Sequence, residues 1–270
     1  MSETAVSERI RETAAVLAPT RETPRGTGLR RVARYSATPL FVAVSLAALY
    51  LYVQGQELDR LEQGRLNAGF IQTSLVQHLR LSLWATFIVL AVAIPLGIAL
   101  TRPWARRVTP FAVAAANIGQ GVPSIGTLVV VYLVVLEDNG ARAAIVGLAI
   151  YALLPVLRGT MVGLQQVDPD IIKAARGMGM SRGEILRRIE LPLSVPILAT
   201  GVRTALVLII STAPLAAFIG GGGLGEIILT GFGFSRSLIV ITGSVLAAAM
   251  ALLADWLGGI AEQTLRPRGL

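Results

Sequence analysis

The sequence predicts an all-α polytopic membrane protein with six transmembrane helices. Hydrophobic residues make up 54% of its 270 residues and charged residues only 15%. Several apolar runs approach the roughly 20 residues that a helix needs to cross a bilayer. Arginines gather beside these runs, where they orient a helical membrane protein. This composition excludes an ordinary soluble domain.

The chain begins with a polar segment, residues 1–37, which contains seven arginines and is expected to be a disordered cytoplasmic tail. A first span follows from about Thr38 to Val53. A cleaved signal peptide is the alternative for this span, but so long a polar stretch does not suit the segment before a signal sequence. Residues 54–79 are expected to form a polar or interfacial connection, and Leu81–Leu100 a second span.

The third apolar region, Thr109–Leu136, is long for one span and contains the string GQGVPSIG at 119–126. Glycine and proline inside a membrane helix are tolerated where the freed backbone groups find protein or water partners. We therefore expect a helix break that lines a cavity. Gln120, Pro123 and Ser124 are candidates for the pathway or its gate.

Three further spans are predicted at 141–164, 195–219 and 238–259. The string GGGGLG at 220–225 lies between the last two. It is either a flexible turn or an external gate, since glycine lets backbones approach closely. The candidate gate residues are Gly220, Gly221, Gly222 and Gly223.

The basic residues predict that both ends of the chain are cytoplasmic. Cytoplasmic segments of membrane proteins carry an excess of arginine and lysine. The net charge of +8 therefore indicates how the chain is oriented in the membrane, and no nucleic-acid partner is expected. In this arrangement, the membrane domain is 38–262 and 263–270 is a short cytoplasmic tail. The external segments hold five arginines: Arg60, Arg65, Arg80, Arg142 and Arg236.

The loop at 166–193 is the only long polar passage in the second half of the chain. It is predicted to hold two short helices with a glycine corner between them. Asp168 suits the N-cap of the first helix and Pro169 its first residue. Gly177 and Gly179 then offer a stop.

The second helix of the loop is predicted from a capping box, in which Ser181 is followed three residues later by Glu184. Pro192 is expected to end it. Helices of about ten residues are too short to be stable alone in water. They must be held either by their own bundle or by a partner, and the residues alone leave both possibilities open.

One string in this loop resembles a family motif. Lys173-Ala174-Ala175, three residues, Gly179, nine residues and Ile189-Glu190-Leu191-Pro192 resemble the "EAA" loop in the permease subunits of ATP-binding-cassette (ABC) importers. The match departs at Lys173, where the family usually has glutamate. Residues 151–205 and 213–228 also look like the permeases of osmoprotectant importers for glycine betaine, choline and carnitine. The resemblance covers about 70–262.

The resemblance implies a type I ABC importer permease fold like that of methionine importers, in the bacterial cytoplasmic (inner) membrane. It also implies a second permease copy, identical or related, a cytosolic ATPase dimer and an extracytoplasmic solute-binding protein, which the glycines at 220–223 could seat. The loop would couple the permease to the ATPase through Lys173, Ala174, Ala175, Arg176, Gly177, Gly179, Ser181, Glu184, Ile189, Leu191 and Pro192.

The sequence predicts a transport subunit without enzymatic activity or cofactor. Its only lysine is Lys173, so the chain lacks the phosphate-binding G-x-x-x-x-G-K-[ST] motif, and a partner would hydrolyse ATP. The sequence offers no cysteine and one histidine, His78, expected at the membrane interface; no metal site or catalytic residues are expected.

Two alternative functions remain. A permease for methionine or another small solute would share this fold. More distantly, an ion-driven secondary transporter would place several ionisable groups at the membrane midplane. The apolar runs contain one carboxylate, Asp255, for which a structural role, such as pairing with an arginine, is favoured. Arg158 and Arg203 are likewise expected to pair or to extend to the interface.

Overall fold

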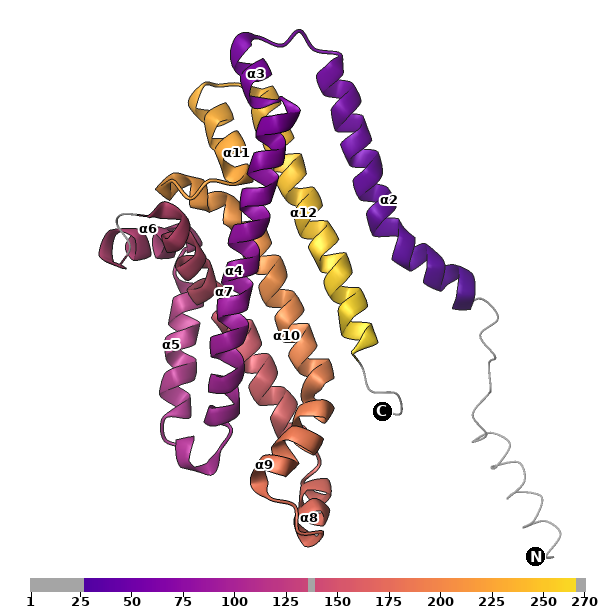
Figure 1. Ribbon diagram of the computed structural model, residues 1–270, viewed down its shortest axis with the longest axis vertical. Coiled ribbons are helices and arrows are strands. Elements are labelled where there is room, and N and C mark those ends of the chain that lie inside the picture. Colours follow the sequence, from indigo (N-terminus) through magenta and orange to yellow (C-terminus); the bar gives the residue numbers. More distant parts are fainter. Residues whose placement is uncertain (1–26, 136–138, 266–270) are drawn as a thin grey trace, which may run out of the picture. The chain divides into compact units, whose positions relative to one another are not determined.

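The structure, a computed structural model, describes residues 27–135 and 139–265, and every regular element in these residues is helical (Figure 1). The chain divides into two compact units, 1–37 and 38–270. The tail predictions for 1–26 and 266–270 lie outside the described residues. Helix α2, Thr27–Gln54, begins inside the segment assigned to the tail, since the leucine, arginine and alanine there favour helix.

The predicted polar connection at 54–79 is wrong, because most of it is helical. A short helix, α3 (Arg60–Arg65), begins at a capping box formed by its N-cap and third residues. Helix α4 follows at Ala68–Leu100 and is capped by Asn67, whose side-chain oxygen accepts the N–H of Phe70 at 2.8 Å.

Three polar residues in the first half of α4 face the protein interior, which helps to explain why the sequence there resembles a connection. Ser74, His78 and Ser82 follow one another at helical spacing and are all buried. The prediction that His78 is interfacial is therefore wrong. Its Nε2 lies 3.1 Å from the carbonyl oxygen of Ile210, so the ring joins α4 to a distant part of the chain.

The predicted break in the third apolar region is present. After a short 3₁₀ turn, η1 (Pro103–Ala105), the region folds as α5 (Thr109–Gly121) and α6 (Ser124–Val135), which meet at 103°. Each helix would be only about 20 Å long at 1.5 Å per residue, shorter than the ~30 Å apolar core of a bilayer. Pro123 lies in the break, where its missing N–H costs no helical hydrogen bond.

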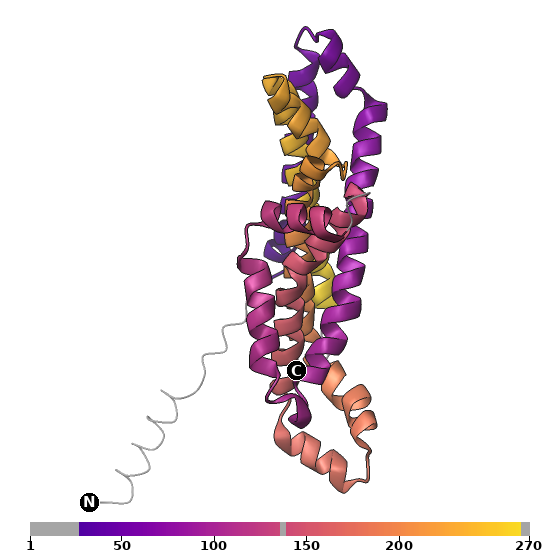
Figure 2. The same cartoon turned by 90° about the vertical axis from the view of Figure 1, so that its left-hand side faces the viewer.

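Helix α7, Gly140–Gln165, runs parallel to α4 (Figure 2). Near one end of the pair, a Cβ built on Gly97 would lie 2.7 Å from the Cβ of Thr160. Near the other end, Arg80 and Arg142 line a common cavity. The chain therefore leaves α4 at one end and enters α7 at the opposite end, so α5 and α6 together carry it back.

The last third of the chain contains α10 (Leu191–Thr212), the 3₁₀ segment η3 (Ala213–Ile219), α11 (Leu224–Gly233) and α12 (Ser237–Thr264). The short helix α11 occupies most of the predicted connection between the last two spans. A Cβ on Gly225 would overlap the carbonyl oxygen of Pro214, so α11 folds back directly onto η3.

Small residues let α7 and α10 approach closely. A Cβ on Gly201 of α10 would lie 2.6 Å from the carbonyl oxygen of Pro155, and one on Gly163 of α7 would lie 2.9 Å from that of Ser194. Such contacts are typical of membrane helices, whose association depends on close packing. Within the described residues, five helices are long and apolar enough to span a membrane, or six if α5 and α6 cross as one.

Candidate functional site

The loop at 166–193 folds as the predicted helix, corner and helix. Helix α8 covers Pro169–Gly177 and α9 covers Arg182–Ile185. Asp168 caps α8, because its carboxylate accepts the N–H of Asp170 at 2.8 Å. The two helices contact each other, and together they extend beyond the ends of α7 and α10 (Figure 1).

The corner between the helices depends on Gly179, whose φ is +84°. The N–H of Met180 donates to the carbonyl of Ala175 at 3.1 Å, and the N–H of Gly179 donates to that of Arg176 at 2.9 Å. This pair of bonds is a Schellman motif, which requires a left-handed residue and favours glycine. A Cβ on Gly179 would meet no atom within 4 Å, so the corner is open on its outer side.

The second helix begins as predicted and ends differently. Ser181 and Glu184 form the capping box: the Glu184 N–H donates to the serine hydroxyl at 3.3 Å, and the Ser181 N–H donates to the glutamate at 3.0 Å. The prediction that Pro192 ends the helix is wrong. A π-helical turn at Leu186–Glu190 leads directly into α10. Pro192 therefore lies just after the π-helical turn, in the first turn of α10.

The loop has one face held by the protein and one face exposed. Ala175 and Ile185 are buried, and Ile189 and Leu191 are partly buried. The apolar side chain of Met178, beside the corner, is 74% exposed. The remaining candidate coupling residues are exposed: Lys173, Ala174, Arg176, Gly177, Gly179, Ser181, Glu184 and Pro192. The loop thus combines packing on its own bundle with a free surface.

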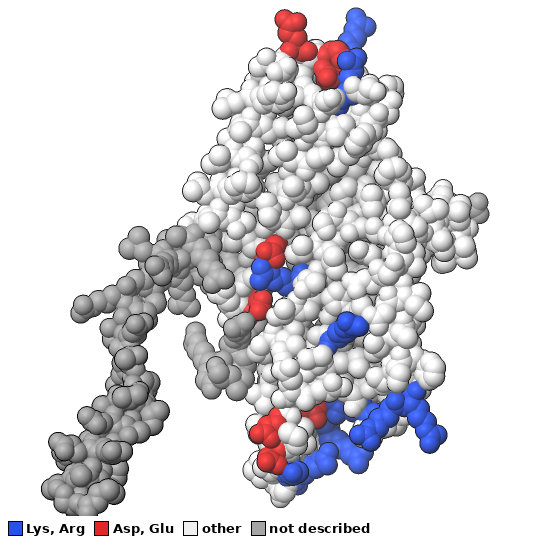
Figure 3. All heavy atoms as spheres, turned by 180° about the vertical axis from the view of Figure 1, so that it is seen from behind, with Lys and Arg blue, Asp and Glu red and all other residues white. Residues whose placement is uncertain are grey.

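An ion pair that the sequence does not predict joins this loop to the end of α4. Arg102, in the turn after α4, lies with its Nη2 2.6 Å from Oε2 of Glu190, and its Nη1 3.4 Å from Oε1. The Glu190 side chain is only 11% exposed. No local pattern in the sequence connects two residues so far apart in the chain. Basic side chains gather at this end of the protein (Figure 3).

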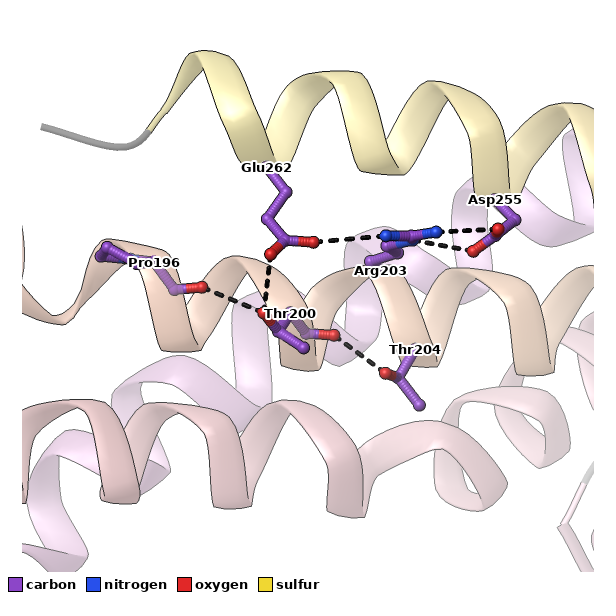
Figure 4. A network of polar contacts seen from close by, with 6 residues as sticks. All are labelled: Pro196, Thr200, Arg203, Thr204, Asp255 and Glu262. Atoms are coloured by element: carbon purple, nitrogen blue, oxygen red, sulfur yellow. Dashed lines mark hydrogen bonds and ion pairs between the residues drawn. The ribbon is translucent and has the colours of Figure 1, made fainter. Parts of the chain in front are cut away.

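Asp255 pairs with an arginine, as expected. Arg203 of α10 donates from Nε and Nη2 to the two carboxylate oxygens of Asp255 on α12, at 2.7 and 2.8 Å (Figure 4). Its Nη1 lies 3.4 Å from Glu262, which also accepts from Thr200 at 3.1 Å. Arg203 lies against Gly259, where a Cβ would be 3.2 Å from Nη1. The cluster therefore joins α10 to α12.

Arg158 also has a partner, since its Nη2 donates to the side-chain oxygen of Asn117 on α5 at 2.8 Å. This pair links α7 to the first half of the broken helix pair. Together with the Arg203 cluster, it explains how arginines are accommodated within apolar segments: each one donates to an oxygen on a neighbouring helix.

The glycine segment at 220–223 is anchored on α4. Gly220, Gly222 and Gly223 have φ values of +71°, +79° and +83°, which only glycine adopts readily. The N–H of Gly223 donates to the side-chain oxygen of Gln77 at 3.1 Å. Gly220, Gly221 and Gly222 also line a cavity of about 920 Å³ between α4, the amino end of α7 and α11.

The other candidate pathway residues lie at the bend between α5 and α6. Gln120 is in the last turn of α5, Pro123 in the break and Ser124 at the start of α6. A second, almost entirely apolar cavity of about 450 Å³ reaches Gly119 on the same helix. Gln120, Pro123 and Ser124 are in the wall of neither cavity.

Curated relatives share most of the chain. The carnitine transport permease protein OpuCD of Listeria monocytogenes is 34% identical over 202 residues, covering 74% of this chain and 89% of that protein. The glycine betaine/carnitine/choline transport system permease protein OpuCB of Bacillus subtilis is 35% identical over 204 residues, covering 76% and 92%. The osmoprotectant import permease protein OsmW of Salmonella typhimurium is 32% identical, covering 76% and 95%.

Solved structures confirm the predicted fold. The chain superimposes on a chain of the inward-facing MetNI methionine ABC transporter with a TM-score of 0.64 and 23% identity, covering 73% of this chain and 96% of that one. A family model described as the inner membrane component of binding-protein-dependent transport systems matches residues 93–267. This chain therefore belongs to the family of binding-protein-dependent transport system inner membrane components.

Proposed function

We propose that this chain is the permease subunit of an ABC importer and forms the translocation pathway for a small osmoprotectant such as glycine betaine, carnitine or choline. The relatives that share at least 74% of the chain support this substrate class, because their names give these solutes. The fold shared with a methionine transporter does not favour methionine, since sequence identity there is only 23%.

The observation that carries this proposal is the geometry of the loop at 166–193. Its corner combines a left-handed glycine with a Schellman motif and leaves open space outside Gly179. An exposed pair of short helices suits docking into a groove on a cytosolic ATPase. Met178 supplies an exposed apolar contact beside the corner. Conformational changes that accompany ATP hydrolysis in the ATPase would thus reach α7 and α10 through this loop.

The proposal includes the rest of the complex. A second permease copy, identical or related, completes the pathway, and an ATPase dimer binds the two loops. An extracytoplasmic binding protein delivers the solute to the side that carries α3 and the glycine segment. The chain has six spans, counting α5 and α6 as one, with both termini in the cytoplasm and the membrane domain at 38–262.

The test is ATP-dependent uptake by the reconstituted complex. The permease would be purified with its co-purifying subunits, inserted in liposomes and supplied with the binding protein and radiolabelled glycine betaine, carnitine, choline or methionine. Uptake of a quaternary amine that requires internal ATP would support the proposal. Methionine uptake alone would contradict the substrate class. Uptake that collapses with a protonophore at constant ATP would indicate an ion-driven transporter.

A further inference from the structure

Two arginines from facing helices line the 920 Å³ cavity. They are Arg80 of α4 and Arg142 of α7, and neither side chain has a hydrogen bond or ion pair in the part of the chain that the structure describes. Two other arginines at this end of the protein are neutralised: Arg65 pairs with Glu226 at 3.4 Å and Arg236 with Asp59 at 2.6 Å.

The surroundings of these two arginines favour an anion. Like charges that share one hollow repel each other, and an anion between them would relieve the repulsion. The amino end of α7, a helix of 26 residues, lies in the same wall and adds partial positive charge. Arginine is also the residue best suited to hold a carboxylate, because its N–H groups match the two oxygens.

The same wall also contains side chains that attract a cation. Trp84 of α4 lines the cavity and is 51% exposed, and its ring meets Phe87 edge-on at 5.9 Å between centroids. Indole faces attract quaternary ammonium groups. Leu81, Ile88 and Val146 add apolar wall that suits methyl groups. The carboxylate in the wall, Glu226, is already paired with Arg65, so Trp84 is the better partner for a cation.

We propose that this cavity is a solute subsite within the permease and that it selects zwitterionic quaternary amines, which carry both a carboxylate and a quaternary ammonium group. Arg80 and Arg142 bind the carboxylate, and Trp84 binds the ammonium. The inference rests on the proposed function and adds a substrate preference: the permease step favours glycine betaine over choline, which has no carboxylate.

The test compares the two solutes in the complete reconstituted complex. ATP-dependent uptake rates would be measured for radiolabelled glycine betaine and choline, each at a concentration that saturates the binding protein. Loss of one charge-assisted contact is worth about tenfold, so Arg80→Gln and Arg142→Gln should each slow glycine betaine about tenfold and leave choline within about twofold. Trp84→Leu should slow both solutes.

Arg60→Gln is the matched control. Arg60 is another arginine of the external segments, it begins α3, and it is not in the cavity wall, so both rates should be unchanged. If a glutamine variant loses both solutes, the corresponding lysine variant decides: lysine keeps the positive charge and should restore the preference for glycine betaine.

Two failures can be told apart. If the parental complex takes up glycine betaine and the glutamine variants slow neither solute, or slow both equally and lysine restores neither rate, the subsite is wrong while the proposed function stands. A lysine variant that restores uptake without the preference has the same meaning. If the parental complex takes up no quaternary amine, the proposed function fails and the subsite with it.

Discussion

The carboxylate of Glu190 lies 2.6 Å from the guanidinium of Arg102, and this contact joins the end of the candidate coupling loop to the end of α4. Glu190 closes the π-helical turn before α10, whereas Arg102 follows α4 directly. Movement of the loop would therefore reach two helices at once: α10 through the continuous backbone and α4 through the ion pair.

Breaking this ion pair should weaken coupling. Arg102→Gln would leave the nearly buried Glu190 carboxylate without its cation, at a cost between the ~0.5 kcal/mol of surface pairs and the 3–5 kcal/mol of buried ones. We expect inserted permease with uptake lowered several-fold relative to ATP hydrolysis. Arg236→Gln is the control, since its pair with Asp59 lies outside the loop and is 47% and 36% exposed. Equal ratios of uptake to hydrolysis in both variants would exclude this role for Arg102.

The Arg203 cluster should respond unequally to removal of its two charges. Asp255→Asn leaves Arg203 paired with Glu262, so substantial ATP-dependent uptake should remain, without dependence on an ion gradient. Arg203→Gln leaves two carboxylates without their cation and should lower the thermal unfolding midpoint further. The midpoint would be measured on the detergent-solubilised complex. A larger loss for Asp255→Asn would show that the carboxylate has a role beyond this pair.

Close helix contacts predict which glycines tolerate a side chain. At Gly201, an added Cβ would lie 2.6 Å from the backbone of Pro155, and such overpacking costs about 1–3 kcal/mol. Gly201→Ala should therefore lower both the thermal midpoint and the amount of permease in the membrane. Gly64→Ala in α3 is the control, because its Cβ would meet no atom within 4 Å. Similar midpoints for both variants would contradict the close approach of α7 and α10.

Reporter fusions test the proposed topology. A reporter inserted after Arg107 and another after Arg268 should both indicate the cytoplasm, because basic residues gather beside these positions. A reporter inserted between Leu58 and Asn67 should indicate the outside. An external signal after Arg107 would overturn the six-span arrangement.

Local signals in the sequence predicted local features well. The capping box at Ser181, the break at Pro123 and the glycine corner at Gly179 each depend on residues close in the chain, and all three are present. The family motif likewise led to the correct fold. Such features can be predicted because each has a local cause: a capping side chain, the fixed φ and missing N–H of proline, or the left-handed backbone of glycine.

Contacts between distant residues could not be read from the sequence. The start of α4 looked like a connection because polar residues such as His78 face the interior and bond to Ile210. The partner of Arg102 is 88 positions away. The cavity that unites Arg80 and Arg142 exists only once α4 and α7 lie side by side. Pro192 was misread because a π-helical turn before it continues into α10.

The most direct test of the proposed coupling role of the loop at 166–193 is ATP-dependent uptake by the Gly179→Val permease in the reconstituted complex. Valine is poorly tolerated at a φ of +84°. It should distort the corner without touching the bundle, since no atom lies within 4 Å of the added Cβ. Gly179→Asn adds a side chain but accepts a left-handed backbone, so it separates the effect of backbone strain from that of bulk at the docking surface. Gly64→Val is the control for adding valine at an exposed glycine outside the loop.

We predict that the Gly179→Val permease inserts normally in the membrane, retains less ATPase on purification and loses most or all of its uptake. A cysteine placed at Arg176 should cross-link to a cysteine on the ATPase surface in the parental protein, which has no cysteine of its own, and the cross-link should weaken in the variant. A Gly179→Val permease that holds its ATPase and transports at the parental rate would contradict the account, leaving a loop that only packs beneath its own bundle.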